Sequence, residues 1–113
     1  MSDGPLVRYF LERGEPVELM PERGWLPQGS HPAVSYVQSG WLNRVHDDDQ
    51  GKPAITATYV PGDFINLDTI CEQEPHGRIC ALTPAEVLTV PIEDLQKAMR
   101  KDEPLMLNFM QRL

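Results

Sequence analysis

The 113-residue chain is short of cysteine, aromatic residues and positive charge, and it has no long apolar run. No stretch approaches the roughly 18 apolar residues that a membrane-spanning helix needs, and the N-terminus does not have the pattern of a secretory signal. We therefore expect a cytoplasmic protein, outside membranes, in which Cys71 and Cys80 are reduced thiols. Ten basic against 17 acidic residues give a net charge of −7, which argues against DNA binding by this chain alone.

Proline and glycine, by contrast, are abundant, with 11 and eight residues respectively. Hydrophobic residues make up 41% of the chain, enough for one packed core in a single domain. Runs of β-forming residues alternate with turn signals at intervals of roughly 8–12 residues, a spacing typical of β-barrels and sandwiches. The sequence therefore predicts a mainly β, antiparallel domain with short flanking helices.

The expected elements follow from apolar periodicity. Alternation predicts strands at 16–20, 33–37, 41–45 and 55–60, and two more within 80–90 around a turn at 83–84. Helical spacing predicts helices at 6–13 and 92–99, and a second C-terminal helix that begins at Asp102, Glu103 and Pro104.

This last helix carries an apolar stripe at positions i, i+3, i+4 and i+7, formed by Met106, Phe109, Met110 and Leu113. Such a stripe suits a dimer seam, and packing against the barrel is the alternative. The sequence ends within the stripe and without a cap signal, which suggests a helix that continues in a longer protein.

Three motifs occur in a fixed order: Tyr36 to Gly40 (YVQSG), Pro61 to Phe64 (PGDF) and Glu86 to Pro91 (EVLTVP), the last leading into a helix. Each motif alone is an ordinary strand or turn signal. In this order and spacing they resemble the cyclic-nucleotide-binding-type jelly roll of the CRP/FNR superfamily of transcriptional regulators. The resemblance implies a β-barrel sensor domain over residues 1–102 and the start of a dimerisation helix over 103–113. It also implies a DNA-binding domain that is absent from this chain.

The segment after Gly62 indicates which branch of the superfamily the chain resembles. Cyclic-nucleotide binders have Gly-Glu here and later Arg-Ser/Thr-Ala, so that the Glu binds the ribose and the Arg pairs with the phosphate. This chain has no Gly-Glu, the Arg position falls on Pro75, and Arg78 lies three residues late, which on a strand points it to the opposite face. We therefore expect no cyclic nucleotide binding. The stretch from Gly62 to Asp68 resembles the FNR branch instead.

The effector and any cofactor stay unknown. FNR's own iron–sulfur cluster is excluded because no cysteine precedes Cys71, which leaves relatives that sense haem-bound gases, a redox signal or a small molecule, or that sense nothing. The resemblance places candidate ligand-binding residues in one segment: Asn66, Leu67, Asp68, Cys71, His76 and Arg78. The expected partners are a second copy of the chain through the C-terminal helix and DNA through the absent domain.

Two alternative functions use the same barrel. A small cupin-like metal-binding barrel would need two or three histidines and a carboxylate in one site. The spacing of His31, His46 and His76 does not match that pattern. A protein-interaction module with a vestigial pocket stays open. We predict no metal site and no catalytic residues, since the serines and histidines lack the motifs of hydrolases and metalloproteases, and Asp47 to Asp49 is interpreted as a solvated hairpin tip.

Overall fold

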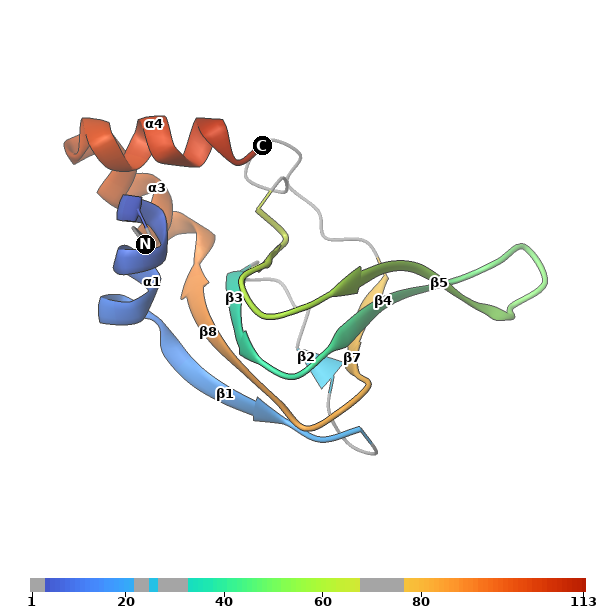
Figure 1. Cartoon of the computed structure of the whole chain (residues 1–113). Helices are drawn as coiled ribbons and strands as arrows, with labels where there is room; N and C mark the ends of the chain where they lie inside the picture. Colours follow the sequence, from blue (N-terminus) through green and yellow to red (C-terminus); the bar gives the residue numbers. More distant parts are fainter. Residues whose placement is uncertain (1–3, 22–24, 27–32, 68–76) are drawn as a thin grey trace.

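The computed structural model describes residues 4–21, 25–26, 33–67 and 77–113, which form two four-stranded sheets with three helices at one end (Figure 1). One sheet has the order β1-β8-β3-β6, from strands Glu15–Leu19, Ala85–Pro91, Ala33–Ser39 and Phe64–Ile65. The other has the order β2-β7-β4-β5, from strands Trp25–Leu26, Arg78–Ala81, Leu42–Asp47 and Pro53–Tyr59. All pairings between these strands are antiparallel, so the predicted mainly β, jelly-roll-like fold is confirmed.

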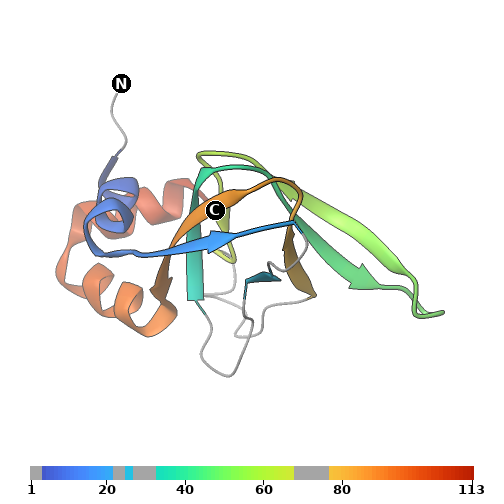
Figure 2. The same cartoon turned by 90° about the horizontal axis from the view of Figure 1, so that it is seen from below.

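The helices α1 (Gly4–Arg13), α3 (Ile92–Lys101) and α4 (Glu103–Gln111) gather beside the end of β8, and the β4–β5 hairpin projects from the opposite side (Figures 1 and 2). The start of α4 follows the sequence prediction, since the Asp102 side chain accepts a hydrogen bond from the Leu105 amide at 3.1 Å. In turn, the Asn108 side chain of α4 accepts from the Leu6 amide at 2.9 Å. This bond satisfies one free amide in the first turn of α1 and ties the two helices together.

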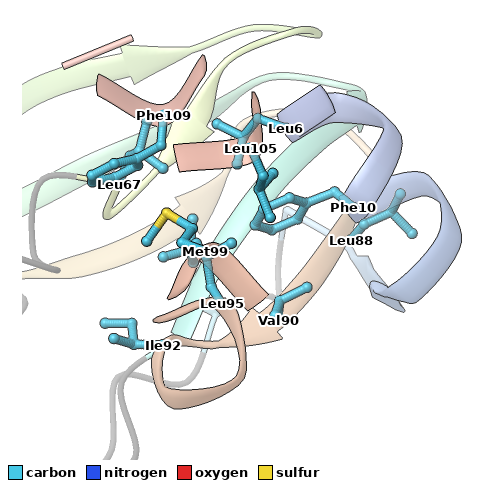
Figure 3. Packing of buried hydrophobic residues seen from close by; sticks show 11 residues of the cluster. Leu6, Phe10, Leu67, Leu88, Val90, Ile92, Leu95, Met99, Leu105 and Phe109 are labelled. Carbon is cyan, nitrogen blue, oxygen red and sulfur yellow. The ribbon is translucent and has the colours of Figure 1, made fainter. Parts of the chain in front are cut away.

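Two hydrophobic clusters form the interior. The first, which we call the helical core, joins the three helices to β3 and β8 (Figure 3) and consists of Leu6, Phe10, Val34, Leu67, Leu88, Val90, Ile92, Leu95, Met99, Leu105 and Phe109. The second, which we call the barrel core, lies between the two sheets and consists of Leu19, Val37, Leu42, Ile65, Ile79, Ala81, Ala85 and Val87. The inward and outward alternation on β7 follows the strand prediction, with Ile79 fully buried and Cys80 partly exposed.

Gly40, in the first of the three motifs, is required by close packing as well as by conformation. Its φ of +82° is the left-handed value expected of a turn glycine. A Cβ atom there would lie 2.3 Å from the Pro84 carbonyl oxygen and 2.5 Å from Ala85 Cα. The β3–β4 turn therefore packs directly on the start of β8, immediately before the third motif.

The apolar stripe predicted on the last helix is divided between two environments. Phe109 is only 4% exposed and belongs to the helical core, with Met106 partly buried beside it. Met110 and Leu113 are 59% and 62% exposed, and Leu107, which was not in the predicted stripe, is 52% exposed. Placing Phe109 on an open seam was therefore wrong, because its side chain is buried in the helical core with Leu67. A dimer seam on the remaining exposed residues stays a prediction.

Candidate functional site

A cleft of about 550 Å³ lies between the segment that follows β5 and the C-terminal end of α4. Its volume falls in the range of small-molecule sites. Among the described residues it is lined by Thr58, Tyr59, Gly62, Asp63, Phe64, Asn66, Leu67, Arg112 and Leu113. The lining thus brings the PGDF motif, the start of the predicted ligand-binding segment and the last helix into one site.

The PGDF motif forms a tight turn that is anchored on β3 and fixes one wall of the cleft. Gly62 has a φ of +98°, and its amide donates to the Val37 carbonyl at 2.9 Å, while the Val37 amide donates to the Asp63 carbonyl at 2.9 Å. The Asp63 carboxylate accepts from the Val60 amide at 2.9 Å, which closes the turn on itself. The Asp63 carboxylate therefore serves to close the turn.

Asn66 forms the inner end of the cleft and has an unusual backbone conformation. Its φ is +68°, the only positive value for a non-glycine residue in the described chain, and the residue is only 3% exposed. Asparagine is among the residues that best tolerate the left-handed region. The Asn66 side chain accepts a hydrogen bond from the Arg44 guanidinium and donates to the Ala33 carbonyl at 3.4 Å.

Arg44 connects this turn to the opposite sheet. It lies on β4 two residues after the buried Leu42, so both side chains are on the inner face. Its Nε donates to the Tyr59 hydroxyl at 3.1 Å, and another guanidinium nitrogen donates to Asn66. One arginine therefore positions two side chains that line the cleft.

The end of α4 supplies the remaining wall. The Arg112 guanidinium lies over the Phe64 ring, 5.3 Å from its centroid, which is within the range of cation–π attraction. Phe64 in turn makes an edge contact with Phe10 of α1 at 5.2 Å between ring centroids. The cleft is thus built on aromatic packing that extends into the helical end of the molecule.

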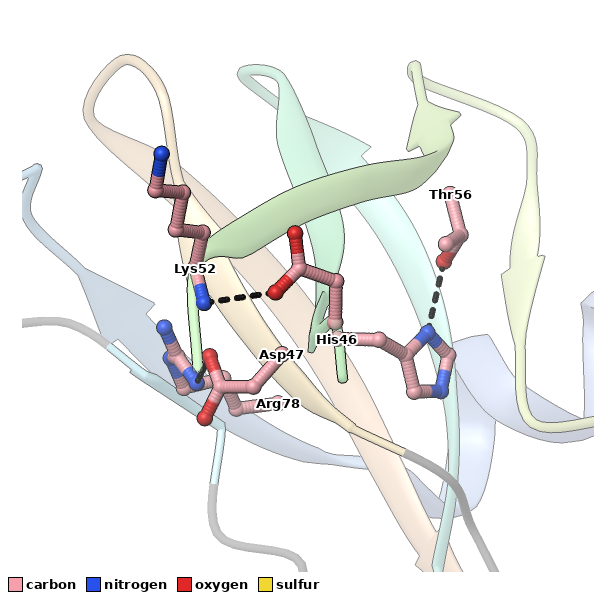
Figure 4. Close-up of polar contacts among 6 residues, drawn as sticks. His46, Asp47, Lys52, Thr56 and Arg78 are labelled. Carbon is pink, nitrogen blue, oxygen red and sulfur yellow. Dashed lines mark hydrogen bonds and ion pairs between the residues drawn. The ribbon is translucent and has the colours of Figure 1, made fainter. Parts of the chain in front are cut away.

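The predicted ligand-binding residues have different positions relative to this cleft. Asn66 and Leu67 line it, although Leu67 also belongs to the helical core and is 7% exposed. Arg78 does not line it: its guanidinium pairs with the Asp47 carboxylate of the hairpin at 3.3 Å (Figure 4). Arg78 alternates with the buried Ile79, as the strand argument predicted. Asp68, Cys71 and His76 lie outside the described residues.

Three residues of the site were missed in the sequence: Arg44, Tyr59 and Arg112. A signal existed for Arg44, because strand alternation after Leu42 places it on the inner face, where a charged residue is unusual. Tyr59 pairs with Leu42 across the β4–β5 ladder, so it shares that face. Nothing in the sequence pattern pointed to Arg112, because the approach of the α4 end to Phe64 depends on how the helices pack.

A second groove lies between α1 and α3, and it is lined by Tyr9, Arg13, Val90, Pro91, Asp94, Lys97, Ala98 and Lys101. Burial raises the pKa of the Tyr9 hydroxyl, the Asp94 carboxylate raises it further, and the Arg13 charge opposes this shift. None of Asn66, Leu67 and Arg78, the predicted ligand-binding residues that the structure describes, lies there. We therefore regard the cleft at Asn66 as the candidate site.

The described parts of the chain contain no group of three or more His, Cys, Asp or Glu side chains that could hold a metal ion. His46 shares a hydrogen bond with the Thr56 hydroxyl at 3.0 Å (Figure 4), and Cys80 is a free thiol. His31 and His76 fall outside the described residues, so the cupin-like alternative gains no support and is not tested. Nor is any helix within the described segments long and apolar enough to span a membrane.

Comparison with known proteins identifies the family and the fold of the chain. The family profile described as "Cyclic nucleotide-binding domain" matches residues 26–102, more than half of the chain. No curated protein matches the chain.

Among solved structures, a transcriptional regulator from Thermotoga maritima has a TM-score of 0.77 at 20% identity, over 93% of this chain and 84% of that one. The sensor domain of the transcriptional regulator DNR from Pseudomonas aeruginosa has a TM-score of 0.75 at 15% identity, over 94% of this chain and 73% of that one.

The catabolite activator protein of Thermus thermophilus has a TM-score of 0.73 at 17% identity, over 93% of this chain. The match covers only 50% of that protein, so the present chain spans about half its length.

Proposed function

The chain belongs to the cyclic nucleotide-binding domain family, and from this membership we propose that it is the signal-sensing domain of a CRP/FNR-type transcriptional regulator. In this proposal a signal at the cleft repositions α4, which serves as the dimer helix. A separate domain, outside this sequence, reads the DNA, and the protein acts in the cytoplasm. We propose no catalytic role.

The observation that carries the proposal is the position of α4 between the core, the cleft and the surface. Its inner face, with Leu105 and Phe109, is fixed in the helical core. Its end, at Arg112, lines the cleft. Its outer face carries exposed apolar side chains at Leu107 and Met110. A shift at the cleft would therefore reach a surface that is suited to a second copy of the same helix.

The residues at the family's cassette positions support a signal other than a cyclic nucleotide. The segment in which cyclic-nucleotide binders have Gly-Glu contains Leu67, whose apolar side chain is buried in the helical core. Arg78, the nearest arginine after it, pairs with Asp47 on the hairpin. Titration calorimetry with cyclic AMP and cyclic GMP should therefore give no binding heat, and clear micromolar binding would contradict this part of the proposal.

Dimerisation through α4 can be tested by sedimentation of the 113-residue chain over a range of concentrations. We expect a reversible dimer, and we expect Met110→Glu and Leu107→Glu to be monomeric, because a charge would be buried in an apolar seam. Leu82→Glu is the matched control, since Leu82 is 48% exposed in the turn before β8, away from α4. A dimer that persists in both α4 variants, or a chain that is monomeric at every concentration, would rule out the α4 seam.

A further inference from the structure

We infer that the cleft takes a small organic anion, with a carboxylate or phosphate group between Tyr59 and Arg112 and an apolar body against Phe64 and Leu67. The inference rests on the proposed sensing function and specifies the chemical class of the signal. It differs from the recognition mode of cyclic-nucleotide cassettes, because neither polar group belongs to the cassette segment that follows Asn66.

Tyr59 provides one hydrogen-bond donor for such an anion. A phenol has one O–H hydrogen to donate and also oxygen lone pairs that accept. The Tyr59 oxygen accepts from Arg44 Nε at 3.1 Å, and no described group receives its own hydrogen. Accepting from a guanidinium polarises the hydroxyl and makes it a stronger donor toward an anionic oxygen. Because Tyr59 lines the cleft, a bound ligand is a natural acceptor.

Arg112 provides the positive charge. Its guanidinium is held over the Phe64 ring, and it forms no ion pair with any described residue. The guanidinium is a planar fork of N–H groups, and these form no ion pair with a described carboxylate. That planar fork matches the two oxygens of a carboxylate or phosphate.

The rest of the lining fits an anion with an apolar part. Asp63 is the only acidic side chain among the described residues of the lining, and its carboxylate accepts from the Val60 amide within its own turn. Phe64, Leu67 and Leu113 add apolar surface, and a volume of about 550 Å³ suits a small molecule better than a peptide segment. The ligand class is therefore an amphipathic small molecule with one anionic end.

The test uses two anionic probes, phenylacetate and phenyl phosphate, and a neutral partner of the first, phenylacetamide. Each is titrated into the 15N-labelled chain, and binding is followed from the amide signals of residues 62–67. We expect the anions to shift these signals, with phenylacetamide bound at least about tenfold more weakly. We also expect the affinity for the anions to fall as salt is added.

Three variants assign the effect to named groups. Arg112→Gln should weaken anion binding roughly tenfold and Tyr59→Phe severalfold, whereas Arg100→Gln on the exposed side of α3 should change nothing. Equal binding of acid and amide, an unchanged affinity in Arg112→Gln, or no binding of either anion would overturn the inference. None of these results bears on the α4 seam, so failure here and failure of the proposed function are read from separate experiments.

Discussion

The helical end of the molecule and the β4–β5 hairpin are held by opposite kinds of contact. At the helical end, eleven buried apolar residues from three helices, two strands and the cleft wall form one continuous cluster (Figure 3). In the hairpin, residues 53–56 are exposed, and the side-chain contacts are polar. His46 contacts Thr56 and Asp47 contacts Arg78 (Figure 4), and Asp48 accepts from two amides of its own turn.

This difference separates where stability and sensing are expected to reside. Apolar burial is the larger stabilising contribution, and exposed polar pairs contribute little. A signal that moves α4 must therefore act against a well-packed cluster, while the hairpin can change conformation at small cost. The cleft lies on the side of the packed cluster, since Leu67 belongs to both.

The largest effect that would test this contrast is expected from Phe109→Ala. Removing a buried phenylalanine leaves a cavity at the junction of α4 and Leu67, and such changes cost about 3–5 kcal/mol of unfolding free energy. Urea denaturation followed by circular dichroism measures this cost. Met110→Ala, one position further along α4 and 59% exposed, should change the unfolding free energy by under about 0.5 kcal/mol at concentrations where the chain is monomeric.

If the two α4 substitutions cost the same, Phe109 is not part of the helical core and the predicted stripe would be one surface after all. If Met110→Ala is the more costly of the two even at low concentration, the assignment of the faces of α4 is reversed.

Asn66 joins the two regions, because Arg44 reaches it from β4 and Leu67 follows it in the helical core. Asn66→Val removes both side-chain hydrogen bonds and places a β-branched residue at a φ of +68°, which we expect to cost about 2–4 kcal/mol. Asn66→Gly keeps the backbone conformation and should cost less. Thermal unfolding of both variants measures the difference.

Equal costs for Asn66→Val and Asn66→Gly would show that backbone conformation plays no part at this position and that the hydrogen bonds account for the whole effect.

Most of the fold was predictable from the sequence because its signals are local. Alternation, turn residues and the Asp102 cap placed six of the eight described strands and the C-terminal helices within a few residues, and the order of three motifs indicated the jelly roll. The two-residue strands β2 and β6 were not predicted, because they are too short to show alternation. The errors lie where tertiary packing decides. Helical periodicity put Phe109 and Met110 on one stripe, but the position of α1 and Leu67 buries only the first.

The site was less predictable for the same reason. The family pattern led to the segment after Gly62, and two of its residues, Asn66 and Leu67, do line the cleft. The rest of the lining includes Tyr59, just before the PGDF motif, and Arg112 at the far end of the sequence, and neither belongs to a motif. Arg78 is the opposite case. It lies close to the family's arginine position in the sequence, but its guanidinium pairs with Asp47 and does not line the cleft.

A smaller effect is expected where α4 begins. Asp102→Ala removes the side-chain acceptor of the Leu105 amide, and the loss of such a cap costs about 1 kcal/mol. Asp102→Asn retains an acceptor and should recover most of this loss, which urea denaturation can resolve. If Asp102→Ala also weakens the dimer by more than the change in helix stability, the start of α4 would belong to the seam.

The smallest effect is expected in the hairpin, from the Asp47–Arg78 pair. Their side chains are 55% and 34% exposed, so a double-mutant cycle of Asp47→Ala and Arg78→Ala should give a coupling of about 0.2–1 kcal/mol, decreasing with added salt. Anion binding in the cleft should be unaffected by either substitution, because neither residue lines it. A coupling of several kcal/mol would mean that the hairpin is as firmly held as the helical end. Loss of anion binding on removing Arg78 would instead restore this residue to the ligand site that the family pattern first indicated.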